Sequence, residues 1–159
     1  MENIPPVSIA LNKDKVPHKV YRHQTPVKTI EEAAAARGQA LSQLIRSILF
    51  RIEKDQFVLV MIAGPTQLSW PALRAHLGQS RMTMATKDEV LRITGYPIGT
   101  VAPIGLKQPL RLLADKSVFS PEEISLGSGQ RGTAIIIKTK DLKKYLENVE
   151  VGSFADLGK

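Results

Sequence analysis

Residues 57–63, FVLVMIA, form an unbroken apolar run with several β-branched side chains, and Gly64 ends it. A bounded apolar run of this length is typical of a strand. Because no polar residues alternate with the apolar ones, we expect both faces of the strand to be buried. A chain that contains such a strand must supply packed structure on each side of it.

This strand is the second half of a predicted hairpin. A first, mostly apolar run covers residues 47–52, and the polar segment EKDQ between the two runs is typical of a turn. Shorter strands are predicted within residues 16–23, 81–85, 110–115 and 133–139, with one more directly before residue 127.

Helices are predicted where capping residues flank a helical stretch. Thr29 and Glu32 form a capping box before a run of alanines, and Thr86 and Glu89 repeat the pattern. Ser69 caps a third helix, which has a proline in its first turn. Glycines follow these three helices, at Gly38, Gly78 and Gly95. Further short helices are predicted over residues 40–47, from residue 120, and over 140–146.

Strands and helices mix without a regular βαβ repeat, which predicts an α+β fold: a single domain with a mixed, partly antiparallel β-sheet surrounded by short helices. With 159 residues, 43% of them hydrophobic, the chain suffices for one sizeable core but not for two. Residues 1–17 hold three prolines and no period, and they are predicted to be an irregular N-terminal arm. The domain is expected over 18–150, and a C-terminal tail over 151–159.

Composition argues against several classes of function. The chain has no cysteine, and its histidines show neither an i,i+4 pair nor the H-E-x-x-H pattern, so we expect no metal and no cofactor. No apolar run reaches the roughly 20 residues of a membrane span, and the N-terminus lacks the order of a signal peptide. A cytoplasmic protein without a membrane partner is expected.

The net charge of +7 favours an anionic partner such as a nucleic acid. The basic residues are spread along the chain, so a solvated basic surface explains them about equally well. Aromatic residues make up only 5% of the chain, which argues against a general single-strand binder. A short contact with the end of a nucleic acid fits better.

Two glycine-rich loops stand out. Residues 94–105, TGYPIGTVAPIG, carry three glycines and two prolines but no charge. Residues 127–132, GSGQRG, match the dinucleotide-binding pattern G-x-G-x-x-G, but a strand follows them where that pattern requires a helix. Each loop is therefore either a plain turn or a backbone-built site for an anion or a carbonyl oxygen.

Several segments occur in an order that is similar to one known family: QLIRSILF, FVLVMIAG, the stretch from LRAHLG to VAPIG, LLAD and GSGQRG. Between about Tyr21 and Leu146, the chain resembles the YbaK/ProX family of aminoacyl-tRNA deacylases, which also occurs as the editing domain of some prolyl-tRNA synthetases. The resemblance implies an α+β fold with a mixed sheet. It also implies hydrolysis of the ester that joins a wrong amino acid, such as cysteine or alanine, to the 3′ end of tRNA.

That chemistry gives the uncharged 94–105 loop a role. Attack of water on the ester carbonyl creates an oxyanion, which fixed backbone N–H groups stabilise by roughly 3–4 kcal/mol per donor. Glycine lets the substrate approach, and proline keeps the loop rigid. Thr100 stands where many members have glycine, which narrows the loop. The residues expected to form this part of the site are Ile98, Gly99, Thr100, Val101, Ala102 and Pro103.

The family also carries a lysine, usually followed by threonine, at the head of the central strand. The matching residues are Arg46 and Ser47. An arginine stays protonated and cannot act as a base, but its charge can still bind a phosphate or a carbonyl oxygen. Arg46, Ser47 and Gly99 are therefore the expected catalytic residues.

Other residues are expected to bind the substrate. Tyr21 and His23 match residues near the first strand of some relatives, although half-buried strand positions explain them as well. Asp115 matches a family aspartate that would either orient Arg46 or cap the segment after it. The second glycine-rich loop contributes Gly127, Ser128, Gly129 and Arg131.

Taken with the resemblance, these residues predict a trans-editing deacylase for tRNA that carries a small amino acid such as cysteine or alanine, with tRNA-Pro as a candidate. Its expected partners are the 3′ end of aminoacylated tRNA and, as a further candidate, an aminoacyl-tRNA synthetase. The alternative is a binding module that lost hydrolysis when Arg46 replaced the lysine. A hydrolase of other small acyl esters is a third reading.

Overall fold

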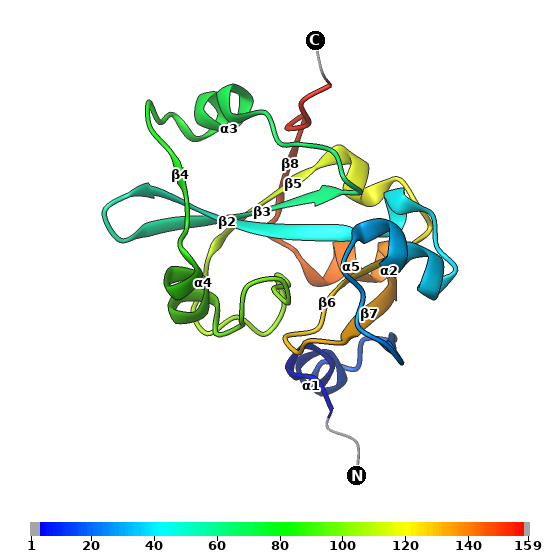
Figure 1. Cartoon of the computed structure of the whole chain (residues 1–159). Helices are drawn as coiled ribbons and strands as arrows, with labels where there is room; N and C mark the ends of the chain where they lie inside the picture. Colours follow the sequence, from blue (N-terminus) through cyan, green and yellow to red (C-terminus); the bar gives the residue numbers. More distant parts are fainter. Residues whose placement is uncertain (1–3, 158–159) are drawn as a thin grey trace.

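The computed structural model describes residues 4–157, which fold into two β-sheets with helices around them (Figure 1). The strands are β1 (Lys19–Arg22), β2 (Ile45–Glu53), β3 (Gln56–Ala63), β4 (Thr83–Met84), β5 (Arg111–Asp115), β6 (Glu123–Gly127), β7 (Thr133–Lys138) and β8 (Glu150–Gly152). The helices are α1 (Pro6–Lys13), α2 (Ile30–Arg37), α3 (Trp70–Leu77), α4 (Lys87–Thr94) and α5 (Thr139–Tyr145). Two 3₁₀ turns, η1 (Leu41–Gln43) and η2 (Lys116–Phe119), complete these elements.

The larger sheet has the strand order β4-β2-β3-β5-β8, and the smaller one the order β1-β7-β6. In the larger sheet β2 is antiparallel to both β3 and β4, whereas β3, β5 and β8 run parallel to one another. The predicted α+β fold with a mixed, partly antiparallel sheet is therefore confirmed. None of the helices within residues 4–157 is both long and apolar enough to cross a membrane.

The predicted hairpin is formed by β2 and β3, and the β3 prediction is confirmed in detail. Every residue of β3 after Gln56 is buried. Val58, Val60 and Ile62 pack into the cluster that includes α3, while Leu59 and Met61 belong to the main core on the other face. In Figure 1, α3 lies on one side of the larger sheet, and α4 and α1 lie on the other.

The three helices predicted from caps and glycines are confirmed. The hydroxyls of Thr29 and Ser69 accept hydrogen bonds from backbone N–H groups inside the first turn. Thr86 and Glu89 form the full capping box, in which each side chain bonds the backbone of the other. The helices end at Gly38, Gly78 and Gly95, all with positive φ.

Two short helices were wrongly predicted. Over residues 40–47 only η1 forms, and β2 begins at Ile45. Pairing with β3 provides the backbone hydrogen bonds that a helix would otherwise have provided. The turn predicted from residue 120 lies earlier, as η2. The Asp115 side chain accepts a hydrogen bond from the Ser117 N–H and starts the turn there.

Segments near both ends of the described residues pack against the domain. The segment predicted to be an irregular arm contains α1, in which Val7 and Leu11 are fully buried. The Val7 N–H donates to the Ser128 carbonyl in the second glycine-rich loop. Near the other end, β8 joins the larger sheet and Phe154 is buried. The boundaries at residues 17 and 150 stay a prediction.

Candidate functional site

A pocket of about 270 Å³ lies between β2, β4, α4, the loop after α4 and the end of β6. Its walls are mainly apolar, and its lining residues are Ile45, Arg46, Ser47, Ile48, Leu49, Met84, Ala85, Val90, Ile98, Gly99, Val101 and Gly127. Six of these were predicted site residues: Arg46, Ser47, Ile98, Gly99, Val101 and Gly127. The fold thus brings the start of β2 together with both glycine-rich loops.

Strand β2 offers unpaired backbone to this pocket. The Leu49 carbonyl accepts a hydrogen bond from the Ala85 N–H, and β4 pairs only with Phe50 and Arg51 beyond that point. In an antiparallel strand, every second residue directs both backbone groups to the same edge. Ser47 therefore directs its N–H and C=O to the edge that β4 does not reach, where the pocket lies.

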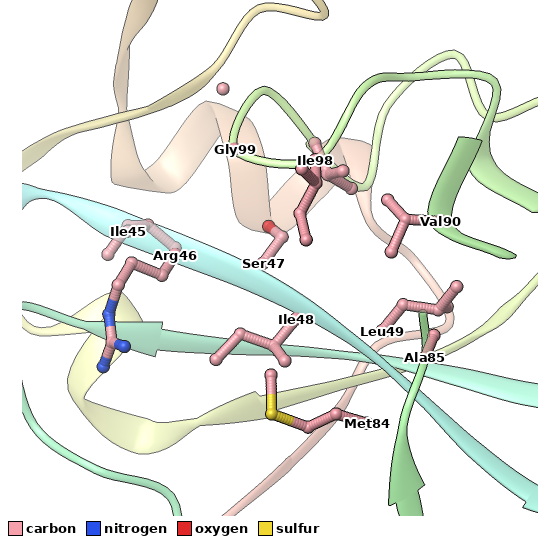
Figure 2. A pocket seen from close by; sticks show the side chains of 12 residues that line it. Ile45, Arg46, Ser47, Ile48, Leu49, Met84, Ala85, Val90, Ile98 and Gly99 are labelled. Atoms are coloured by element: carbon pink, nitrogen blue, oxygen red, sulfur yellow. The ribbon is translucent and has the colours of Figure 1, made fainter. Parts of the chain in front are cut away.

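The Ser47 hydroxyl is buried, and it has no hydrogen-bond partner in the part of the chain that the structure describes. In Figure 2 it points toward the loop that carries Ile98 and Gly99. A buried hydroxyl without a partner loses free energy relative to water, and a bound polar group would restore it. Ser47 is thus placed to hydrogen-bond a molecule in the pocket.

Arg46 points the other way. Its guanidinium is directed away from Ser47 and Gly99 (Figure 2), donates to the Gly64 carbonyl at 2.8 Å and also donates to the Thr66 carbonyl. Burial lowers the pKa of Arg46. Although Arg46 contributes to the pocket wall, its charge is engaged by the segment between β3 and α3.

The 94–105 loop is held by its own hydrogen bonds. The Tyr96 hydroxyl donates to the carbonyls of Ile104 and Gly105, and Thr100 donates from both its N–H and its hydroxyl to the Pro97 carbonyl. Gly99 has φ 87°, and nothing lies within 4 Å of where its Cβ would stand. Gly99 therefore supplies open, rigid backbone at the pocket wall.

Other residues predicted in this loop take different places. Ile98 is 41% exposed beside the pocket, whereas Val101 is buried in its wall. Ala102 and Pro103 are buried, and neither lines the pocket. Thr100 lines a neighbouring groove. Within residues 4–157, no protein acceptor is bonded by the N–H groups of Gly99 and Val101.

The neighbouring groove, of about 700 Å³, shares Gly99 with the pocket. It is lined by His23, Gln24, Thr25, Pro26, Val27, Arg37, Gly99, Thr100, Gln130, Arg131, Gly132 and Thr133. Three predicted site residues, His23, Thr100 and Arg131, therefore lie here and not in the pocket. Arg37 was missed by the sequence analysis. Its only local signal is that it ends an alanine-rich helix without an acidic residue one turn before it.

Three more predicted residues have structural partners. Tyr21 donates its hydroxyl to the Ala36 carbonyl at the end of α2, and its ring contacts His23 edge-on. The Ser128 hydroxyl bonds the Gln130 carbonyl inside the second glycine-rich loop. The Gly129 N–H donates to the Thr100 carbonyl, which ties the two glycine-rich loops together.

Asp115 is buried and binds the backbone of the segment that follows β8. Its carboxylate accepts hydrogen bonds from the N–H groups of Phe154 at 2.7 Å, of Ala155 at 3.1 Å and of Ser117 at 3.1 Å. Burial alone would raise the pKa of Asp115, but these hydrogen bonds outweigh it and hold the pKa below the ordinary carboxyl value. Of the two predicted roles for Asp115, the structure has the capping role.

We expect Asp115→Asn to lower the free energy of unfolding at pH 7 by about 2 kcal/mol, because an amide replaces a charged acceptor of three N–H groups. A lowered folded-state pKa stabilises the protein above the unfolded pKa of about 3.9, and this contribution is lost as the pH falls through the folded pKa. The difference between wild type and variant should therefore shrink toward pH 3. Urea unfolding at both pH values measures it, with exposed Asp88→Asn as control. A difference that is independent of pH would contradict the assignment.

Comparison with known proteins agrees with this geometry. The profile of the family described as Aminoacyl-tRNA editing domain matches residues 24–145. The chain belongs to this family. The family predicted from the sequence is confirmed, and the aminoacyl-tRNA editing class of activity is supported with it.

Individual relatives of this editing domain are of two kinds. The Bacillus subtilis uncharacterized protein YwhH is 32% identical over 79% of this chain and 80% of its own length. The Kosmotoga olearia proline–tRNA ligase is 34% identical over 69% of this chain, which spans only 19% of that ligase. A crystal structure of a candidate trans-editing enzyme for prolyl tRNA synthetase superposes with a TM-score of 0.86, at 26% identity over 95% of both chains.

Proposed function

We propose that this chain is an aminoacyl-tRNA deacylase that acts in trans on misacylated tRNA. The observation that carries the proposal is the pocket, because one mainly apolar cavity is lined by Ser47, whose buried hydroxyl has no partner among the described residues, and by Gly99 and Val101, whose N–H groups bond no acceptor within residues 4–157. Action in trans is supported by the structural neighbour that matches over 95% of both chains. A cytoplasmic location and a synthetase partner stay predictions.

The proposed reaction adds water to the ester carbonyl. The water oxygen bonds to the carbonyl carbon, the bond to the tRNA 3′ oxygen breaks, and the proton that water loses ends on that 3′ oxygen. Backbone N–H groups of the 94–105 loop would stabilise the oxyanion between the two steps, at about 3–4 kcal/mol per donor. An aminoacyl ester is already activated, so no nucleophilic side chain is required.

The same pocket supports a small, uncharged amino acid as the acyl group. Its walls are mainly apolar, and the one charged residue among them, Arg46, directs its guanidinium elsewhere. A charged side chain would therefore be buried there without a partner, at a high cost in free energy. Cysteine and alanine meet this requirement. The relation to proline–tRNA ligases supports tRNA-Pro as the carrier.

The test is a panel of tRNAs charged with alanine, cysteine, serine, aspartate and lysine, followed by measuring loss of the ester. We expect hydrolysis of a small uncharged member at least about a hundredfold faster than of the aspartyl and lysyl members, a difference of about 2.7 kcal/mol. Binding of tRNA with no ester loss from any member would favour the binding-module alternative. Rapid hydrolysis of simple acyl esters but of no aminoacyl-tRNA would favour the third alternative, a hydrolase of other small acyl esters.

Arg46→Met is expected to act on stability more than on chemistry. It removes two hydrogen bonds to the carbonyls of Gly64 and Thr66, so we expect about 1–3 kcal/mol less stability and less than about a tenfold loss of kcat/KM below the melting transition. Arg46→Lys, which keeps the charge but has a single donor nitrogen, should have a stability between those of the wild type and Arg46→Met. Unchanged melting with a much larger loss of kcat/KM would instead support the catalytic role expected from the sequence.

A further inference from the structure

We propose that the groove beyond Gly99 binds the phosphate and ribose of the terminal tRNA nucleotide, with Arg37 as its anion-binding residue. This inference rests on the proposed function. It concerns a different part of the surface from the acyl pocket and a residue that neither the motifs nor the family resemblance singled out.

Arg37 carries a charge that the protein does not neutralise. Its Nε donates to His23 Nε2 at 3.2 Å, and its Nη1 donates to the Ser125 hydroxyl at 2.9 Å. Both acceptors are neutral, and among the described residues no aspartate or glutamate forms an ion pair with Arg37. Burial lowers the pKa of Arg37. A partly buried guanidinium of this kind gains free energy when an anion binds its remaining donors.

His23 holds this guanidinium in place. Its Nε2 accepts the Arg37 hydrogen bond, so that nitrogen carries no proton. Burial and the neighbouring Arg37 charge both lower the pKa of His23, which favours the neutral ring. The Tyr21 ring packs edge-on against His23, with ring centroids 4.9 Å apart. The planar guanidinium of Arg37, with its forked set of N–H donors, is therefore oriented before any ligand binds.

The rest of the groove suits the same ligand. Arg131 adds a second positive charge, and Gln24, Thr25, Gln130 and Thr133 supply polar groups of the kind that bind ribose hydroxyls. None of the lining residues is acidic. The groove, with a volume of about 700 Å³, is larger than the acyl pocket of about 270 Å³, and a nucleotide is likewise larger than a small amino acid.

Gly99 fixes the direction of the substrate because it lines both spaces. An ester with its carbonyl at Gly99 and its acyl group in the pocket continues into the groove with its ribose. The two spaces thus divide the substrate at the bond that is cut. Affinity for the phosphate then positions the ester without placing a charge at the reacting carbon.

The test uses an unreactive analogue, 3′-deoxy-3′-(alanylamino)adenosine, with and without a 5′-phosphate, and measures both affinities by calorimetry. We expect the phosphate to raise the affinity of the wild type at least about tenfold, and Arg37→Met to reduce this gain below about threefold. Arg74→Met, which removes an arginine from α3 on the other side of the larger sheet, should keep the full gain. Melting curves verify folding, and Arg37→Lys, which keeps the charge but loses the fork, should give an intermediate gain.

A wild type without a phosphate gain, or an Arg37→Met protein that keeps the full gain, overturns the inference even if deacylation is observed. A phosphate gain that depends on Arg37 in a protein that hydrolyses no aminoacyl-tRNA supports the nucleotide site and overturns only the proposed reaction. If Arg37→Met fails to fold, the comparison between Arg37→Lys and wild type decides. An equal gain in affinity from the 5′-phosphate in both proteins would contradict the proposed role of the Arg37 guanidinium.

Discussion

Replacing Gly99 by valine is expected to lower kcat/KM for deacylation at least about a hundredfold, equivalent to about 2.7 kcal/mol of transition-state stabilisation. Gly99 lines both the acyl pocket and the groove, and the space around its missing Cβ is empty. A valine side chain would enter that space, where the ester carbonyl is proposed to lie. It would also remove the close approach of substrate to backbone N–H groups.

The same substitution strains the backbone, because Gly99 has φ 87°. Left-handed backbone costs a residue with a Cβ about 1–2 kcal/mol, and a β-branched residue suffers most. Gly78→Val is the matched control, since Gly78 has φ 68° and equally open surroundings but lies at the end of α3. Both variants should lose similar stability by thermal melting, and only Gly99→Val should lose activity. Equal loss of activity in both would make the loop a purely structural element.

Replacing Gly127 by alanine is expected to lower the free energy of unfolding by about 3 kcal/mol and to abolish most of the activity. A Cβ at this position would overlap the carbonyl oxygens of Thr100 and Val101, which are backbone atoms and cannot rotate away. Its φ is not positive, so the clash alone causes the effect. The 94–105 loop must then shift off β6, and the pocket between them changes shape.

Gly78→Ala is the control for adding one methyl group, because its Cβ would meet nothing within 4 Å. Urea unfolding and the deacylation assay measure both variants. The control should lose about 1 kcal/mol through its positive φ and keep its activity. A Gly127→Ala protein as stable and as active as this control would show that the 94–105 loop does not pack against β6 at this position.

The main elements of the fold could be predicted because their signals lie within a few residues of one another. Thr86 and Glu89 cap a helix three residues apart, and the apolar run of 57–63 marks its own strand. The glycine-rich loops were recognisable for the same reason. Gly99, which the sequence analysis singled out because glycine is the residue that a tight approach requires, lines the pocket.

The directions and partners of side chains could not be predicted in this way. Arg46 and Ser47 are neighbours in sequence, but as successive strand residues they face opposite sides of the sheet. In the helix that was wrongly predicted over residues 40–47, the side chains of Arg46 and Ser47 would not have pointed in opposite directions. Which of the two faces the pocket depends on which side of β2 the 94–105 loop covers.

Sequence by itself thus determined the family, the hairpin, the capped helices and the loop that forms the pocket wall. Only the tertiary structure decided that Asp115 binds the backbone of Phe154, that Arg46 binds the carbonyls of Gly64 and Thr66, and that Arg37 meets His23 beside the groove. The physical reason is range. Caps and periodicity act over one turn or a few strand residues, whereas these contacts join segments up to 39 residues apart, and sheet register and packing bring them together.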